Sequence, residues 1–435
     1  MAPIAGRREN QSELAFDGMA SMLLVVAILS GKLALNSLLP GLAPGPLLEF
    51  RLWATIGALA LLWPARATSD WRARLHPAAL ALGALIGLLL VRSLLATNER
   101  SGAIRADLAY MVAQAACVFL ASRRQIVLAA LWVMAFALAM FLLAAAGIAQ
   151  PELNGPGWAP IGGPTTFYRL EFLACCLCWC FYDELGRKHW LLPVFAALFL
   201  YGTLASLSKI ALPGTWLVLA AFAVYQGMRK KWQTVAWIIG TTLVVSITWH
   251  SAMKDDMQVR LDRVAIAPNA NTPRVGTDFE VTVNYCIGAN PPSTEVGCVK
   301  GAFVDRSSRL VFAAHALEGI AANPLWGQGL GTFELHMPNP KTGIGEVYRY
   351  PHNLLLEITL ASGFVGLGLL LLTLGLTFRA SWLAAKRMPA GIYLVGFMVF
   401  IFLSTLVSGD FYDSRLVWLV AFALIGLARS RAPEQ

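Results

Sequence analysis

Long apolar stretches alternate with short polar ones along most of the chain, and one polar region of about a hundred residues interrupts this pattern. Each apolar window holds about 18–25 residues, enough for a helix to cross a bilayer. The windows lie near 14–31, 45–64, 76–96, 104–121, 124–148, 166–184, 189–207, 210–228, 232–252, 353–377, 390–408 and 411–428. We therefore expect an all-α, polytopic membrane protein with about 12 transmembrane helices and one large loop between helices 9 and 10.

The composition agrees with a membrane protein: 57% of the residues are hydrophobic, 14% are charged and the mean hydropathy is +0.61. Soluble domains carry about 25% charged residues. The formal net charge of +9 comes from short basic clusters between the apolar windows. Because these clusters form no basic face interleaved with aromatic residues, we expect no nucleic-acid partner.

Basic residues gather in every second loop, and this asymmetry predicts the orientation of the chain. The clustered residues are Arg7, Arg8, Arg66, Arg72, Arg74, Arg123, Arg124, Arg187, Lys188, Arg229, Lys230, Lys231, Arg379, Lys386, Arg387, Arg429 and Arg431. The positive-inside rule places their loops and both termini in the cytoplasm. The large loop, residues 253–351, then lies outside, in the periplasm of a Gram-negative cell. It separates helices 1–9 (1–252) from helices 10–12 (352–435) in the inner membrane.

Ionisable residues stand at or near the outer ends of the predicted helices. They are Glu49, Arg51, Arg92, Arg105, Asp107, Arg169, Glu171, Lys209, Asp410, Asp413 and Arg415. Charges at membrane depth are costly and usually face a cavity or a partner, so we expect a polar cavity open to the periplasm. Interfacial snorkelling and structural ion pairs are the alternative for part of this set.

The large loop has candidate structure of its own. A short strand is expected near 279–283. Cys286 and Cys298 are the only cysteines of the loop, and an oxidising compartment favours a disulfide between them, with two free thiols as the alternative. Apolar residues recur at helical spacing over 305–322, which predicts a short amphipathic helix with two arginines in its first turn.

The loop ends in the sequence Tyr-Pro-His-Asn at 350–353, directly before the tenth window. Pro351 suits the first position of a helix, which places His352 in the first turn, where backbone N–H groups can hold an anion. A neutral imidazole there could accept a proton. Gly363 and Gly366 fall near the face of His352 and predict a close contact with a neighbouring helix. The alternative is a histidine that only caps a helix at the membrane interface.

Alternating glycines at 327, 329 and 331 lack the Gly-Lys-Ser/Thr of a phosphate loop, so they indicate a tight turn that returns the loop helix to His352. Four basic residues could then converge on that histidine: Arg306, Arg309, Arg349 and Lys209. Guanidinium groups bind phosphate oxygens bidentately, so this cluster suits a lipid diphosphate that arrives within the bilayer.

His352 and Asn353, followed after nine residues by Gly363 and after two more by Gly366, resemble the motif of the O-antigen ligase family. That motif reads His, Asn/Ser/Gln, nine residues, Gly, two residues and Gly/Thr/Tyr. Members of the family share a fold with O-antigen polymerases. The position of the motif, directly after the large loop, also fits the family.

Further segments of the chain are similar to the loop signature of that family, namely 308–309, 323–329 and Phe333. One departure stands in the short turn before the eighth window, where the family usually carries an arginine and this chain has Lys209. Lysine neutralises a phosphate as a point charge but lacks the fork of a guanidinium.

The resemblance implies a GT-C-like glycosyltransferase that moves a glycan from undecaprenyl diphosphate to a sugar hydroxyl of lipid A–core oligosaccharide. His352 would accept the proton of the attacking hydroxyl, and the four basic residues would bind the diphosphate. Direct attack predicts inversion, and a diphosphate leaving group requires neither a metal nor a cofactor. No spacing requires a divalent ion among the outer carboxylates Glu49, Asp107, Asp410 and Asp413.

Two kinds of alternative stay open. An O-antigen polymerase or a protein O-oligosaccharyltransferase would share the donor, the fold and the histidine, and only the acceptor would differ. The short stretch after the last window favours the ligase over protein-glycosylating relatives with an extra C-terminal domain. A transporter of lipid-linked glycans should show repeated halves, whereas the large loop makes the two parts of this chain unequal.

Overall fold

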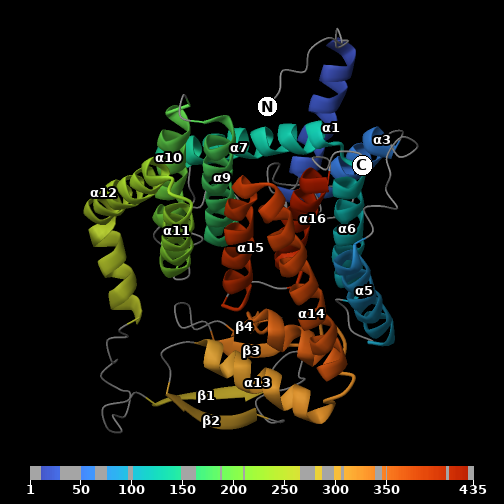
Figure 1. Cartoon of the computed structure of the whole chain (residues 1–435). Helices are drawn as coiled ribbons and strands as arrows, with labels where there is room; N and C mark the ends of the chain where they lie inside the picture. Colours follow the sequence, from blue (N-terminus) through green and yellow to red (C-terminus); the bar gives the residue numbers. More distant parts are fainter. Residues whose placement is uncertain are drawn as a thin grey trace.

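The computed structural model describes residues 11–29, 50–63, 76–96, 101–147, 163–186, 189–208, 211–264, 280–286, 298–304, 308–338, 345–348, 350–407 and 411–429. Most of this chain is helical (Figure 1), and the helices fall on the predicted windows. Those before the large loop are α1 (Gln11–Leu29), α3 (Phe50–Leu62), α5 (Pro77–Leu95), α6 (Ser101–Leu120), α7 (Arg123–Ala145), α9 (Gly163–Leu185), α10 (Leu191–Ala205), α11 (Ala211–Met228) and α12 (Trp232–Val264). The later elements are β1 (Glu280–Cys286), β2 (Cys298–Val304), α13 (Ser308–Ala322), β3 (Leu335–Pro338), β4 (Gly345–Tyr348), α14 (Leu354–Arg387), η3 (Pro389–Gly391), α15 (Ile392–Thr405), η4 (Tyr412–Ser414) and α16 (Arg415–Arg429).

Within the described residues, six helices are long and apolar enough to cross a membrane. They are α5, most of α6, α7, α11, the first two thirds of α12, and α14. Shorter apolar helices cover 15–29, 50–62, 191–205 and 389–405. The helical membrane character of the fold is therefore confirmed, while the count of about 12 spans stays a prediction because the shorter helices do not reach the length of a straight span.

Helix α9 forms the centre of the bundle. Every residue from 167 to 179 is buried, because α7, α10 and α15 pack around this helix. Phe172 of α9 meets Phe400 of α15 with 4.3 Å between ring centroids, and Phe397 lies one turn away on the same helix. Gly214 of α11 leaves room for the same Phe400 ring. Aromatic packing thus joins the middle of the chain to its C-terminal helices.

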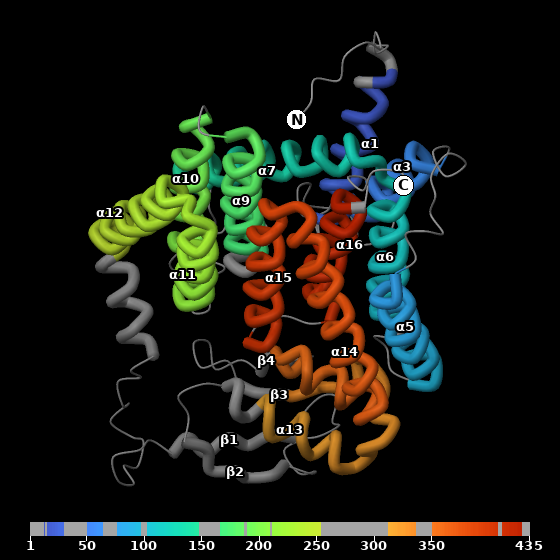
Figure 2. Tube along the Cα trace, in the orientation of Figure 1, coloured from blue at the N-terminus to red at the C-terminus, as the bar shows by residue number. Residues whose placement is uncertain are grey.

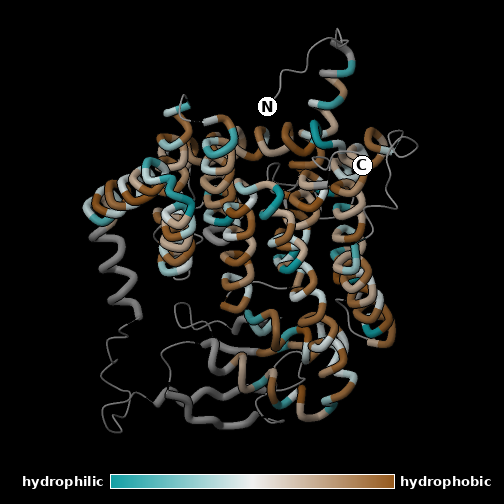
Figure 3. Tube along the Cα trace, in the orientation of Figure 1, coloured by the Kyte–Doolittle hydropathy of each residue, from teal (hydrophilic) through white to brown (hydrophobic). Residues whose placement is uncertain are grey.

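The outer helices expose apolar side chains, as expected of a surface that faces lipid. Hydrophobic residues, brown in Figure 3, dominate most of the helices. Exposed large apolar side chains on α7 and α12 include Leu131, Trp132, Leu142, Ile239, Leu243, Val244 and Ile247. A soluble protein rarely exposes so many large apolar side chains, so this surface of the bundle suits a lipid environment.

Helix α13 lies across one end of the bundle, beside the beginning of α14, and α14 runs from there toward the opposite end (Figures 1 and 2). The predicted loop helix over 305–322 is confirmed from Ser308 onward. The loop also forms two antiparallel ribbons, β1 with β2 and β3 with β4. The strand expected near 279–283 falls on β1, whereas the other three strands were not predicted from the sequence.

Candidate active site

Helix α14 begins at Leu354, two residues after His352. Asn353 is the N-cap, and its Oδ1 accepts a hydrogen bond of 3.1 Å from the backbone N–H of Leu356. Asparagine is among the best N-cap residues because its side chain satisfies a backbone N–H that the helix leaves unpaired. The expectation that Pro351 opens the helix was therefore wrong. His352 precedes the first turn and does not lie in it.

The same asparagine ties the start of α14 to the segment between α15 and α16. Its Nδ2 donates a hydrogen bond of 2.9 Å to the carbonyl of Leu406, just after α15. One turn into α14, Oε2 of Glu357 accepts a hydrogen bond of 2.8 Å from the backbone N–H of Phe411. Both contacts hold the first turn of α14 at a fixed distance from the last helices of the chain.

The imidazole of His352 is held between aromatic rings. Its backbone has a φ of +55°, in the left-handed region, and the residue is half-buried. The ring of Phe312 from α13 stacks on the imidazole, with 5.3 Å between centroids and an interplanar angle of 23°. The ring of Tyr350 lies 4.2 Å away on a tilted plane. Phe312 is held in turn by Phe333, edge to face at 6.4 Å.

Helix α14 is broken eight residues after its start. Ser362 has φ −138° and ψ 15°, and Gly363 has φ +65° and ψ −164°, so neither is helical. The turn at 324–329 supplies hydrogen bonds to the backbone groups that the break releases. The bonds run from the Gln328 N–H to the Leu360 carbonyl (2.7 Å), from the Gly329 N–H to the Ala361 carbonyl (2.9 Å), and from the Phe364 N–H to the Pro324 carbonyl (2.8 Å). We call the break and this turn together the interlock.

Glycines make the interlock possible. A Cβ on Gly363 would overlap the carbonyl of Leu325, and a Cβ on Gly327 would lie 2.5 Å from the Leu360 carbonyl oxygen. Gly366 leaves room for the side chain of the serine at the break. At Gly363 the predicted close approach is real, but a turn of the large loop and not a neighbouring helix makes the contact; at Gly366 the nearest atoms belong to α14 itself.

The turn also holds two further helices. A terminal nitrogen of Arg92, in the last turn of α5, donates a short hydrogen bond to the carbonyl of Gly327. Nε2 of Gln328 donates to the carbonyl of Gly319 in α13 at 2.9 Å. The alternating glycines all have positive φ, as a tight turn requires. The prediction that this turn returns the loop helix to His352 is confirmed, because α13 supplies the ring that stacks on it.

The four predicted diphosphate ligands fall mostly outside the described residues. Arg306, Arg349 and Lys209 lie outside them altogether, and of Arg309 the structure describes only the backbone, in the first turn of α13. The turn that leads to Lys209 contains Leu207, which is buried and has a φ of +51°. The convergence of these four residues on the histidine stays a prediction.

The two loop cysteines face each other across a ribbon. In the antiparallel register of β1 and β2, Cys286 is the partner of Cys298. Residues directly opposite each other in an antiparallel pair have Cα atoms about 4.5–5.5 Å apart, within the range of disulfides. The side chains of both residues lie outside what the structure describes. The register is compatible with the predicted disulfide, which remains a prediction.

Residues 194–371 match the family model described as O-antigen ligase. The matched segment begins in α10, contains the large loop, and ends in α14 beyond the interlock. The chain carries an O-antigen ligase domain. No curated protein matches the sequence. The family resemblance drawn from the histidine motif is therefore confirmed, and an O-antigen ligase domain with several apolar helices indicates a multi-pass membrane enzyme of the ligase and polymerase type.

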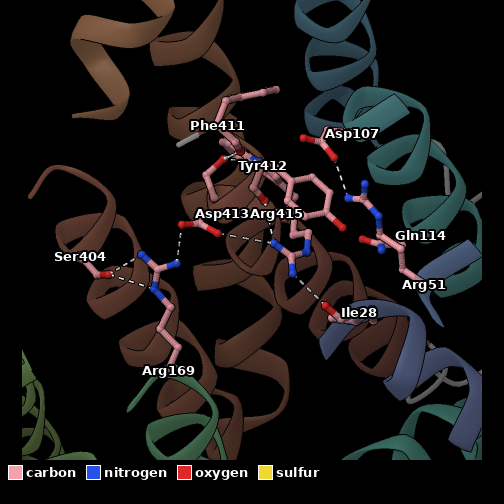
Figure 4. A network of polar contacts seen from close by, with 12 residues as sticks. Ile28, Arg51, Asp107, Gln114, Arg169, Ser404, Phe411, Tyr412, Asp413 and Arg415 are labelled. Atoms are coloured by element: carbon pink, nitrogen blue, oxygen red, sulfur yellow. Dashed lines mark hydrogen bonds and ion pairs between the residues drawn. The ribbon is translucent and has the colours of Figure 1, made fainter. Parts of the chain in front are cut away.

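A second polar feature lies outside the O-antigen ligase domain. Arg51 of α3 and Asp107 of α6 form a buried ion pair at 2.6 Å. Asp413 in η4 joins two arginines, Arg169 of α9 at 3.2 Å and Arg415 of α16 at 3.8 Å (Figure 4). We call these five residues the arginine network. Both guanidinium groups beside Asp413 are buried, whereas Asp413 itself is partly exposed.

Further hydrogen bonds complete the arginine network. Arg169 donates two bonds, of 3.1 and 2.9 Å, to Oγ of Ser404 in α15. Arg415 donates to the backbone carbonyls of Tyr412 and Ile28, both at 3.0 Å. Each of these charged groups thus has an oppositely charged partner. For the members of the arginine network, the alternative of structural ion pairs is confirmed.

The described part of the chain contains no group of three or more His, Cys, Asp or Glu side chains placed to hold a metal ion. Of the outer carboxylates considered for a divalent ion, Asp107 and Asp413 are ion-paired, and Glu49 and Asp410 lie outside the described residues.

The rings around His352 and the contact from Arg92 were not predicted from the sequence. Phe312 lies within the predicted loop helix, and the sequence gives no sign that its ring contacts a histidine forty residues later. Arg92 was identified as a charge at a helix end, but its partner is a backbone carbonyl, which leaves no signature in the sequence.

Proposed function

We propose that the protein is an O-antigen ligase. It transfers a glycan from undecaprenyl diphosphate to a sugar hydroxyl of lipid A–core oligosaccharide, with inversion and without a metal or cofactor. In this proposal both termini are cytoplasmic, about 12 helices cross the inner membrane, and the 253–351 loop stands in the periplasm between the 1–252 and 352–435 parts of the chain.

The observation that carries the proposal is the fixed imidazole of His352 inside the O-antigen ligase domain. Phe312 and Tyr350 contact the ring, and such contacts orient an imidazole. The following residue is fastened twice, by the cap of α14 and by the bond to Leu406. A general base must be held in one geometry to act on a bound hydroxyl, and this arrangement supports that role.

The proposed reaction is a single displacement. The acceptor hydroxyl oxygen forms a bond to the anomeric carbon of the donor while the bond from that carbon to the diphosphate oxygen breaks. His352 accepts the hydroxyl proton, and undecaprenyl diphosphate leaves with the bonding electrons. Arg306, Arg309, Arg349 and Lys209 would bind the diphosphate and stabilise its increasing negative charge.

The test is transfer by purified protein in liposomes that contain undecaprenyl-diphosphate-linked glycan and lipid A–core, with a chelator present. We expect wild type to produce a lipopolysaccharide ladder. His352→Ala should reduce the rate about 100-fold to 10,000-fold, the usual contribution of a general base. Growth of the donor glycan without transfer to lipid A–core would instead identify a polymerase, and no reaction from folded protein would contradict the proposal.

His315→Ala is the matched control. His315 lies on α13 and contacts the same aromatic cluster, with its ring 5.2 Å from that of Phe333, but it has a carboxylate neighbour in Glu318. This variant removes an imidazole from the same layer without removing the proposed base. We expect its transfer rate to stay within about threefold of wild type, a loss below the usual contribution of a general base.

A further inference from the structure

A patch of exposed apolar side chains surrounds the interlock. Leu325 and Trp326 on the turn, with Phe364 and Val365 directly after the break, are between 37% and 61% exposed. They adjoin one another because the Phe364 N–H bonds to the carbonyl beside Leu325. We call these four side chains the apolar wedge. A water-facing loop rarely presents such a cluster.

The apolar wedge continues the lipid-facing surface of two membrane-capable helices. Phe364 and Val365 belong to α14 itself. The turn packs on the end of α5, where a Cβ on Gly329 would lie 2.8 Å from that of Ala96. The neighbouring α5 side chains Val91, Leu94 and Leu95 are 54–68% exposed, as lipid-facing residues are. The wedge is thus an extension of a surface that already requires an apolar solvent.

The backbone hydrogen bonds of the turn are also compatible with an apolar environment. Irregular backbone can enter the hydrocarbon region only where its N–H and C=O groups are bonded within the protein. Here the carbonyls of Asn323, Pro324 and Gly327 accept bonds from Gly327, Phe364 and Arg92 respectively. The N–H groups at 328 and 329 donate to α14. A turn that only crossed the aqueous surface could leave such groups to water.

We propose that the apolar wedge is immersed in the bilayer, at the boundary between head groups and acyl chains on the side of α13. Trp326 is the residue type enriched at that boundary, since its ring is apolar and its indole N–H is polar. The partner of the surface is therefore phospholipid. Immersion anchors the turn, and through the interlock it sets the depth of α13 and His352. This inference does not depend on the reaction that the protein catalyses.

The experiment places a nitroxide at Leu325→Cys and, separately, at Phe364→Cys in the full chain in phospholipid nanodiscs. Collision rates with oxygen, which concentrates in lipid, are compared with those of a water-soluble nickel chelate. Leu94→Cys on α5 is the lipid-facing reference, and Glu318→Cys on α13, whose side chain is 58% exposed, is the aqueous reference. The unsubstituted chain, labelled in parallel, gives the background from native cysteines.

We expect the labels at 325 and 364 to collide mainly with oxygen, as at 94, and the label at 318 to collide mainly with nickel. Dominant nickel collisions at 325 and 364 would overturn the proposal, since the wedge would then face water. Weak collisions with both agents would also overturn it, because a second copy of the chain or another protein surface would then cover the wedge.

A second measurement needs no added cysteine. Acyl chains brominated near the head group quench tryptophans at the bilayer boundary, and the difference between wild type and Trp326→Phe isolates Trp326 from the other tryptophans. The variant should lose a measurable part of the quenchable emission. An unchanged quenchable fraction, with an unchanged melting temperature as proof of folding, would place Trp326 outside the bilayer and overturn the proposal.

Discussion

The interlock and the arginine network both fasten segments that are far apart in sequence, but they use different parts of the chain. In the interlock, backbone N–H groups donate hydrogen bonds to backbone C=O groups, and glycines allow the turn and the broken helix to approach each other closely. In the arginine network, charged side chains pair across α3, α6, α9, η4 and α16. The interlock lies inside the O-antigen ligase domain, and every member of the network lies outside it.

This difference shows where each region tolerates substitution. The interlock has no room for even one added carbon at Gly363 or Gly327, because the neighbouring atoms are backbone that cannot rotate away. The network is held by paired charges, so we expect it to tolerate changes of shape that keep the charges. We therefore expect steric variants to break the first region and charge variants to break the second.

The largest effect is expected for Gly363→Ala. The backbone of Gly363 has a combination of φ and ψ that only glycine adopts readily, and the new Cβ would overlap the carbonyl of Leu325. We expect a loss of more than about 3 kcal/mol in the free energy of unfolding, the sum of backbone strain and steric overlap. Thermal melting in detergent measures it.

Gly368→Ala is the control on the same helix. No heavy atom lies within 4 Å of its would-be Cβ, and its backbone is helical. Alanine stabilises a helix relative to glycine by up to about 1 kcal/mol. Equal melting temperatures for the two alanine variants would contradict the steric account of the interlock.

An intermediate effect is expected for Asp413→Asn. The variant keeps the size of the side chain but leaves the guanidinium groups of Arg169 and Arg415 without their shared countercharge. Removing one partner of a buried ion pair costs about 3–5 kcal/mol, and the partial exposure of Asp413 reduces this to about 1–3 kcal/mol. Asp413→Glu keeps the charge and should recover most of the melting temperature. Glu318→Gln, at an exposed position, should change it little.

The smallest effect separates the two contacts of Asn353. Asn353→Ser keeps a good N-cap but loses the amide that donates to Leu406, for an expected cost of about 0.5–1.5 kcal/mol. Asn353→Ala loses both contacts and should cost about 1 kcal/mol more. If the serine and alanine variants have the same melting temperature, the N-cap hydrogen bond contributes nothing to stability. If Asn353→Ser already lowers the transfer rate, the hydrogen bond to Leu406 positions the histidine.

The same contrast explains what could be predicted from the sequence. Apolar windows predict helices because a membrane span needs a long run of apolar residues, and each window contains one. The alternating glycines predict a turn because their backbone freedom is local. The arginine network could not be predicted in detail, since Arg51 and Asp107 are 56 residues apart and any outer carboxylate was an equal partner.

The break in α14 could not be predicted from the sequence, for a related reason. Gly363, Gly366, Gly368 and Gly375 all lie within one apolar helix, and composition does not show which of them leaves the helical conformation. That choice depends on a turn thirty to forty residues earlier, which supplies the missing hydrogen bonds. Likewise Pro351 and Asn353 both signal a helix start, and the stronger capping side chain determined the boundary.

The left-handed backbone of His352 has a consequence for anyone who engineers this protein. A side chain with a Cβ costs about 1 kcal/mol in that conformation, and glycine or asparagine would adopt it with less strain. Glycine at this position would relieve the backbone strain but would also remove the ring that contacts Phe312 and Tyr350. In the proposed function, His352→Gly would remove the general base while relaxing the backbone that held it.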